Sequence, residues 1–324
     1  MRVILIGGTG MIGTWLGNVL RDGGHEVWIV SRSEPESDHW LSWTMSRGIA
    51  DVRRLEGADV VVNLVGAPIA DRPWTKMRRR VLRESRIDAT RVIVGSLARL
   101  DAPPKAYIGM GHLGFYGDRG DTILDESDAQ GEGFLAELSN DWEKAHLAAA
   151  ETLGARGVVL RMAVSLAPTG GVFPLMLQPF RVGLGGWLGK GKQYLPWIGI
   201  RDTVRAIEFL MERSDLHGVF NGCVPEPTRQ KDWAKALGRA MGKPVLRNAP
   251  KWALQGALGE LANVLFLASI RAVPGRLLRA GFKFENTDAE ALFRWMVHEF
   301  EHPEEGTGRH KPVRRRGRAG RIRR

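Results

Sequence analysis

The segment with the clearest chemical potential is a glycine-rich stretch that follows the first apolar run of the chain. Residues Met1–Ile6 have the composition of a strand, and next comes Gly7-Gly8-Thr9-Gly10-Met11-Ile12-Gly13, a Gly-x-x-Gly-x-x-Gly pattern that opens a helix. Glycines at these places allow a tight turn, close approach of the backbone to a pyrophosphate, and close packing of helix on strand. Free N–H groups and the positive helix end then attract phosphates. The pattern predicts a dinucleotide site, with a merely tight strand-to-helix turn as the alternative.

The tip of the second expected strand indicates which dinucleotide is preferred. That strand ends in Val30-Ser31-Arg32-Ser33. An NAD site normally carries an acid here, which accepts a hydrogen bond from the ribose 2′-hydroxyl. This tip has no carboxylate, and Arg32 offers a guanidinium to a 2′-phosphate. We therefore expect NADP(H) instead of NAD(H), unless Arg32 is a surface arginine without a role.

A third apolar run ends in small residues where a sheet would meet the adenosine. The run Val60–Leu64 is followed by Val65-Gly66, and Gly66 would let the backbone come close to a ligand. Ordinary turn chemistry at the end of a strand would look similar. The segment is therefore a further candidate part of the predicted nucleotide site, with an ordinary strand-end turn as the alternative.

The elements that must position these residues alternate between short apolar runs and helical patterns, which indicates a parallel sheet with crossover helices. We predict an α/β fold, a Rossmann-type doubly wound parallel sheet whose ligand crevice lies at the carboxyl ends of the strands. A smaller, mostly helical C-terminal substrate lobe follows. The expected strands are 3–6, 26–30, 60–64, 106–110 and 158–160, and the expected helices are 11–21, 76–99, 140–153 and 203–212.

Composition and charge limit the classes of function. The chain has 324 residues, of which 44% are hydrophobic, and this is typical of a water-soluble globule. Eight arginines and one lysine lie between residues 307 and 324, and these nine leave only +2 of the net charge of +11 for the rest. We interpret this tail as disordered and solubilising, with weak binding to nucleic acid or anionic lipid as the alternative.

The cysteine count and the apolar segments bear on metal content and on location in the cell. Cys223 is the only cysteine, which excludes an intramolecular disulfide and a thiolate metal cluster, and we expect no metal. The N-terminus has no signal peptide pattern, and the most apolar later stretch, Trp252–Ala272, is too polar to span a lipid bilayer. We expect a cytoplasmic protein without a membrane partner. The sequence leaves the oligomeric state open.

These motifs resemble the extended short-chain dehydrogenase/reductase superfamily, in particular its atypical branch of NAD-dependent epimerase/dehydratase-like "epimerase family" proteins. The resemblance runs to about residue 297 and includes a C-terminal domain of unknown function. It implies a Rossmann fold, NADP(H), and a pocket between two lobes for an unassigned small-molecule substrate. The cofactor-binding residues that it implies, together with the motifs above, are Gly7, Gly8, Thr9, Gly10, Met11, Ile12, Gly13, Ser31, Arg32, Asn63, Leu64, Val65, Gly66 and Arg86.

The catalytic residues depart from the superfamily, whose members generally use a Tyr-x-x-x-Lys pair and a serine. The chain has no Tyr-x-x-x-Lys, and the pair falls near Leu138 and Trp142. The serine position falls around Gly111-His112, so His112 is the titratable side chain expected at the reacting centre, and Tyr116 is a second candidate. His112 instead could cap a strand end, and Tyr116 could pack in the core.

The resemblance also assigns residues to the substrate cleft and divides the chain. Gln193 and Trp197 match cleft-lining positions, although the residues that follow, Gly199, Arg201 and Asp202, differ from those usual in relatives. We expect an NADP(H)-binding domain over 1–165 with contributions from about 196–224, substrate-lobe segments over 166–247, a small helical domain over 248–300, and the basic tail over 301–324.

Two functions remain after this reading. One is an NADP(H)-dependent, epimerase/dehydratase-like oxidoreductase that acts on a small carbonyl or sugar-type substrate, for which binding and positioning supply part of the rate enhancement. The other is a noncatalytic NADP(H)-binding or redox-sensing protein. Because the catalytic pair is missing, the sequence leaves both functions open.

Overall fold

The computed structural model of the protein describes residues 1–245, 247–249, 256 and 259–302. The basic tail from residue 303 onward and part of the expected C-terminal domain lie outside the described residues. Most of the apolar 252–272 stretch lies inside them, beginning at residue 256. In the described part, no helix is long and apolar enough to cross a membrane.

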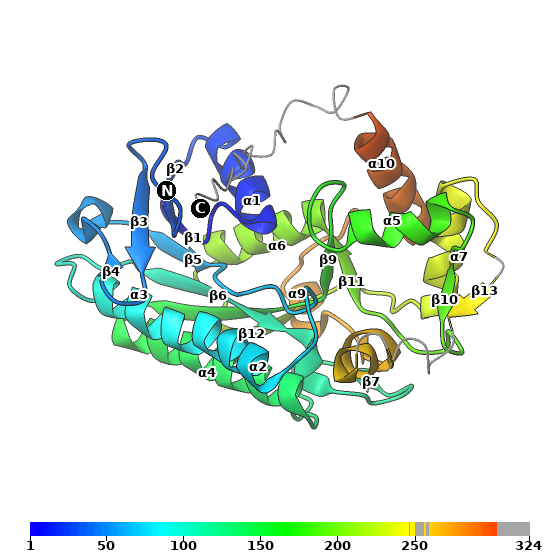
Figure 1. Ribbon diagram of the computed structural model, residues 1–324. Coiled ribbons are helices and arrows are strands. Elements are labelled where there is room, and N and C mark those ends of the chain that lie inside the picture. Colours follow the sequence, from blue (N-terminus) through cyan, green and yellow to red (C-terminus); the bar gives the residue numbers. More distant parts are fainter. Residues whose placement is uncertain (246, 250–255, 257–258, 303–324) are drawn as a thin grey trace, which may run out of the picture.

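The fold is built on an eight-stranded sheet, which confirms the predicted α/β class (Figure 1). All neighbouring strands are parallel except the last pair, β3 and β4. In spatial order the strands are β12 (Gly218–Gly222), β8 (Arg156–Met162), β6 (Ala106–His112), β5 (Val60–Asn63), β1 (Arg2–Ile6), β2 (Glu26–Ser31), β3 (Trp40–Thr44) and β4 (Gly48–Ile49).

Helices cover both faces of this sheet, because alternate residues of each buried strand point to opposite sides. Val3 and Leu5 of β1 belong to one apolar cluster with residues of α1 and α6, whereas Ile4 and Ile6 belong to another with residues of α3 and α4. The covering helices are α1 (Met11–Asp22), α2 (Lys76–Arg83), η2 (Glu84–Asp88), α3 (Ala89–Leu97), α4 (Phe134–Thr152) and α6 (Ile200–Glu212).

The strand order reverses between β1 and β5, and this reversal creates the crevice in which such sheets bind ligands. The chain runs from β1 outward through β2 and β3, then returns to the other side of β1 and continues through β5, β6 and β8. Gly7 and Leu64 meet at the carboxyl ends of β1 and β5, where a Cβ on Gly7 would lie 3.3 Å from the Leu64 backbone.

A second, mostly helical lobe packs beside the carboxyl edge (Figure 1). Its core joins α5, α7 and α10, and the ring of Trp295 on α10 meets Trp15 of α1 at 6.2 Å. Its helices are α5 (Phe173–Arg181), α7 (Gln230–Ala240), η4 (Ala262–Leu267) and α10 (Ala289–Glu301), whereas α9 (Gly275–Arg279) packs on β12 at the edge of the main sheet. The remaining short elements are η1 (Val52–Leu55), η3 (Leu113–Tyr116), β7 (Ile123–Leu124), β9 (Val164–Leu166), β10 (Gly186–Leu188), β11 (Trp197–Gly199), β13 (Arg247–Ala249) and β14 (Arg271–Ala272).

Several elements differ from those expected. The expected helix 76–99 is interrupted by the π-helical turn η2, and the helix expected from residue 140 begins at Phe134. The strands β3, β4 and β12 were not anticipated, because each is short or interrupted by polar residues and gains its order from pairing with a neighbour.

Candidate functional site

The glycine loop between β1 and α1 has almost no space for side chains. A Cβ on Gly13 would lie 2.6 Å from Cα of Gly8, and one on Gly8 would lie 2.6 Å from Cδ1 of Ile29. Gly7 adopts φ +76°, which side-chain-bearing residues rarely adopt. The loop therefore lies against the sheet with its backbone bare, as the sequence predicted.

The N-terminus of α1 presents its positive end to this loop. Its first turn has no acidic residue, and in the described part of the chain no side chain caps it. A Cβ on Gly171 would lie 2.9 Å from Sδ of Met11, so the loop after β9 closes over the start of the helix. This bare, positive terminus is suited to an anionic group such as a pyrophosphate.

The tip of β2 lies beside the same loop. The buried Ser31 hydroxyl lies 3.1 Å from Oγ1 of Thr9 and accepts a hydrogen bond from N–H of Ser33 at 3.2 Å. These contacts fix the turn that carries Arg32, whose side chain is exposed. Arg32 thus stands exposed at the tip of β2, where a guanidinium can meet an anion.

The end of β5 is shaped by the buried side chain of Asn63. Its Oδ1 accepts a hydrogen bond from N–H of Val65 at 3.1 Å, and its Nδ2 donates to the hydroxyl of Tyr107 at 2.7 Å. The chain therefore turns at Leu64, and Gly66 emerges at the surface. Asn63 is buried and fixes the backbone of the turn, whereas Leu64, Val65 and Gly66 are partly or fully exposed at the crevice.

Arg86, in η2, places a buried positive charge directly beneath this turn. Its guanidinium donates to O of Ala67 at 2.9 Å and packs on the ring of Trp142 at 4.7 Å. Its Nε has no hydrogen-bond partner among the described residues. Burial and the neighbouring cation Arg78 lower the pKa of Arg86 to about 10. Because buried charges are normally paired, an unneutralised guanidinium at this place calls for an anion.

The expected positions of the tyrosine and lysine of the superfamily are apolar and buried. Leu138 and Trp142 are 1% and 6% exposed, and both lie on α4. The guanidinium of Arg86 packs on the ring face of Trp142. The positive charge that a lysine on α4 would supply therefore comes here from an arginine in η2. The sequence pattern did not predict this contact between Arg86 and Trp142.

His112 ends β6 and begins η3. Its Nδ1 accepts a hydrogen bond from N–H of Gly114 at 2.8 Å, so the side chain caps the short helix, as the sequence allowed. Burial and the charge of Arg86 lower the pKa of His112 to about 4. The ring is therefore neutral at physiological pH and does not suit the role of a proton donor that we first considered.

Tyr116 is fully buried and belongs to a polar network that joins β8, β12 and α4. Its hydroxyl accepts a hydrogen bond from Nη1 of Arg161 at 2.8 Å and lies 2.9 Å from Oδ1 of Asn221. Burial is the main cause that raises the pKa of Tyr116 to about 12. Arg161 in turn forms a buried ion pair with Glu143, with N–O distances of 2.8 and 3.0 Å. The structure places Tyr116 in the core, the alternative named above.

The two residues expected to line a substrate cleft have different places. Nε2 of Gln193 donates to O of Leu188 at 3.2 Å and to O of Phe266 at 3.0 Å, so Gln193 joins two segments of the second lobe and stays partly exposed. Trp197 has 0% exposure and donates to Oγ1 of Thr228 at 3.2 Å. Trp197 therefore differs from expectation, because its ring fills the core of the second lobe.

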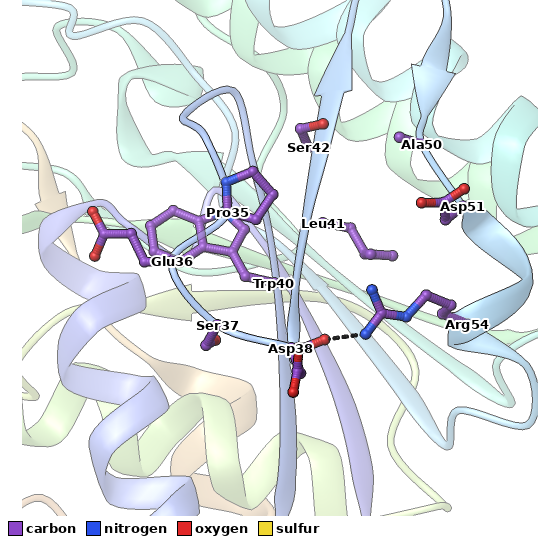
Figure 2. Close-up of a pocket in the computed structure, with 10 residues that line it drawn as sticks. All are labelled: Pro35, Glu36, Ser37, Asp38, Trp40, Leu41, Ser42, Ala50, Asp51 and Arg54. Carbon is purple, nitrogen blue, oxygen red and sulfur yellow. Dashed lines mark hydrogen bonds between the residues drawn. The ribbon is translucent and has the colours of Figure 1, made fainter.

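A surface cavity of about 420 Å³ lies beside β3, whose Ser42 lines it and pairs with Ser31 of β2 (Figure 2). Glu36, Asp38 and Asp51 supply carboxylates to its lining, and Arg54 is turned to O of Asp38. Negative charge on this lining opposes binding of a phosphate. The crevice at the carboxyl ends of β1, β5 and β6 is the better candidate.

The structure thus brings the glycine loop, the β2 tip, the β5 turn, Arg86 and His112 to one edge of the sheet, and it takes Tyr116 and Trp197 into the core. Among the residues that the structure describes, no group of histidine, cysteine or acidic side chains is placed to hold a metal ion.

Comparison with known proteins shows which family has this architecture. Residues 3–221 match the model of the NAD dependent epimerase/dehydratase family, and residues 249–296 match a domain of unknown function, DUF1731. An epimerase family protein of Mycobacterium bovis is 40% identical over 291 residues, which are 90% of this chain and 96% of that protein.

Solved structures agree with this assignment. The crystal structure of human epimerase family protein SDR39U1 (isoform 2) with NADPH has a TM-score of 0.82 and 30% identity, covering 92% of this chain and 99% of that one. A nucleoside-diphosphate sugar epimerase from Corynebacterium glutamicum has a TM-score of 0.75 and 30% identity, covering 93% of this chain and 58% of that one.

Proposed function

We propose, since the chain belongs to the NAD dependent epimerase/dehydratase family, that it is an NADP(H)-binding oxidoreductase of the epimerase type that acts on a small carbonyl or sugar-type substrate. One observation carries this proposal. The bare glycine cradle lies at the point where the strand order reverses, with an exposed arginine and no acid at the β2 tip.

The residues of the crevice fit the cofactor. The backbone of Gly7–Gly13 and the start of α1 would hold the pyrophosphate, and Ser31 and Arg32 would hold the adenosine 2′-phosphate. Leu64, Val65 and Gly66 would border the adenosine, with Asn63 fixing their turn. The buried guanidinium of Arg86 would bind an anionic or oxygen-rich part of the cofactor, which would compensate its charge. Crystallisation of a similar human protein with NADPH supports this choice.

The chemistry then depends on positioning more than on an acid–base pair. When bound, the reduced nicotinamide supplies a hydride. The chain would contribute by holding the carbonyl at the carboxyl edge of the sheet, beside the β5 turn and His112, and such orientation lowers the barrier by several kcal/mol. Because Leu138 and Trp142 replace the proton-transferring pair, we assign the proton to water.

A second candidate is a noncatalytic NADP(H)-binding protein that responds to cofactor occupancy. Leu138 and Trp142 favour it, because neither side chain moves a proton at neutral pH. This alternative keeps the same cofactor site and differs only in turnover.

The test is a fluorescence titration with NADPH followed by a screen of carbonyl compounds for NADPH oxidation. We expect saturable binding of NADPH and turnover of at least one class of carbonyl compound. Binding without oxidation of cofactor by any compound would favour the noncatalytic protein. Failure to bind either NADPH or NADH at about millimolar concentration, where even a weak site of about −4 kcal/mol is half filled, would overturn both.

A further inference from the structure

The hydrogen bond at Nδ1 fixes the tautomer of His112. N–H of Gly114 lies 2.8 Å from this atom. A backbone N–H only donates, so Nδ1 must keep its lone pair, and the proton of the neutral ring must sit on Nε2. Protonation of Nδ1 would set two donors against each other and remove the cap of η3.

The charged groups around His112 also favour the neutral ring. Arg86 approaches from η2 and disfavours a second positive charge. From α4, Glu143 reaches the neighbourhood, since a Cβ on Gly111 would lie 3.3 Å from its Oε1. Both oxygens of Glu143 are occupied by Arg161, so this carboxylate does not compensate an imidazolium.

The other ring nitrogen is available to a ligand. Nε2 of His112 has no hydrogen-bond partner in the described part of the chain. The side chain is half-buried, and Nε2 is not one of the polar atoms that are buried without a partner. His112 ends β6, next to the β5 turn and Arg86, at the edge where parallel sheets bind ligands. His112 therefore brings a hydrogen-bond donor to this edge of the sheet, with its proton fixed by the fold.

We propose that Nε2–H of His112 holds the carbonyl oxygen of the substrate as a neutral hydrogen-bond donor, and that it keeps its proton throughout. This inference rests on the proposed reduction of a carbonyl. The carbonyl carbon accepts the hydride, its oxygen takes the electron pair, and water then protonates that oxygen. A neutral imidazole can polarise a carbonyl in this way, because a preorganised donor stabilises the negative charge that develops on oxygen.

The first test measures the tautomer without turnover. The full-length protein with NADP⁺ and ¹⁵N-labelled histidine is studied by NMR, and the His112→Gln variant identifies the resonances of His112 among those of eight histidines. We expect a neutral Nε2–H ring from about pH 5.5 to about pH 8, the range in which an ordinary histidine titrates. We also expect saturating benzaldehyde to shift the Nε2 resonance. An Nδ1–H tautomer, titration near the ordinary pKa, or no shift with benzaldehyde would overturn the proposal.

The second test separates hydrogen bonding from proton transfer. His112→Gln keeps an N–H donor that neither gains nor loses a proton, whereas His112→Ala removes the donor. For NADPH-dependent reduction of benzaldehyde, we expect the alanine variant to lose about 10²–10³ in kcat and the glutamine variant to lose about tenfold or less. The kcat of the wild-type protein should not change with pH over the same range.

Equal losses in the two variants would show that the proton itself is transferred, and an alanine variant as active as the wild type would remove His112 from the reaction. Both results contradict the proposal. If the wild-type protein binds benzaldehyde at His112 by NMR but oxidises no NADPH, the proposed reductase function fails, whereas the fixed tautomer and its contact with the carbonyl stand.

Discussion

Substitution of Gly13 by alanine tests the cradle at the point where it is tightest. The new Cβ would lie 2.6 Å from Cα and 2.7 Å from C and O of Gly8, whereas ordinary contact begins at 3.4 Å. The start of α1 and the glycine turn must therefore separate by about 0.8 Å. Both neighbours are backbone, so no side-chain rotation can relieve the contact.

The size of the effect follows from this separation. Overpacking of this kind costs about 1–3 kcal/mol of stability. The same movement displaces N–H groups that must lie within about 3 Å of a phosphate oxygen, so we expect the Kd for NADPH to rise at least tenfold, or about 1.4 kcal/mol. Fluorescence titration measures the Kd, and thermal unfolding measures the stability.

Gly95→Ala is the matched control. Gly95 lies in α3 with a negative φ, and a Cβ there would meet nothing within 4 Å. Alanine is the better helix former by about 0.8–1 kcal/mol, so this variant should bind NADPH normally and unfold at the same or a higher temperature. Unchanged NADPH affinity in a folded Gly13→Ala variant would refute the assignment of the loop to the cofactor.

Two further predictions concern the buried polar groups. Tyr116→Phe removes the hydroxyl between Arg161 and Asn221, so it should lower the free energy of unfolding in urea by about 1–3 kcal/mol while the Kd for NADPH stays unchanged; a large loss of NADPH affinity without loss of stability would contradict the placement of Tyr116 in the core. The half-buried ring of His112 and the buried ring of His146 have pKa values lowered to about 4 and about 3, so between these values and the unfolded pKa of about 6.5 the unfolded chain binds more protons. Stability should therefore fall as pH drops below about 6.5, by up to about 1.4 kcal/mol per pH unit for each ring, and His146→Gln should reduce this slope in pH-dependent urea unfolding; an equal slope in the variant would contradict a neutral buried His146.

The sheet and the glycine cradle were predictable because local rules determine them. Val3–Ile6 and Val60–Val62 are continuous β-branched or aliphatic runs, and the glycine pattern that follows β1 leaves few other conformations. The strands β3 and β12 were missed, because their pairing partners β2 and β8 lie elsewhere in the sequence and supply their order.

The roles of single side chains were less predictable, because long-range contacts determine them. Tyr116 meets Arg161 and Asn221, which lie 45 and 105 positions further along the chain. Trp197 has the residue type of a cleft-lining side chain, but α7 and α10 enclose it in the second lobe. By contrast, the cap formed by His112 on Gly114 is local, and the strand-end pattern allowed it to be considered from sequence.

The most direct test of the account is the cofactor preference set by Arg32. The measurement compares the Kd values of NADPH and NADH for the wild-type protein, for Arg32→Ala, and for the control Arg99→Ala, whose exposed side chain follows α3 at the opposite edge of the sheet. We predict that the wild-type and control proteins bind NADPH at least tenfold more tightly than NADH, and that Arg32→Ala loses most of this preference by weakening NADPH alone. Similar Kd values for the two cofactors in the wild-type protein, or an unchanged preference in Arg32→Ala, would contradict the account.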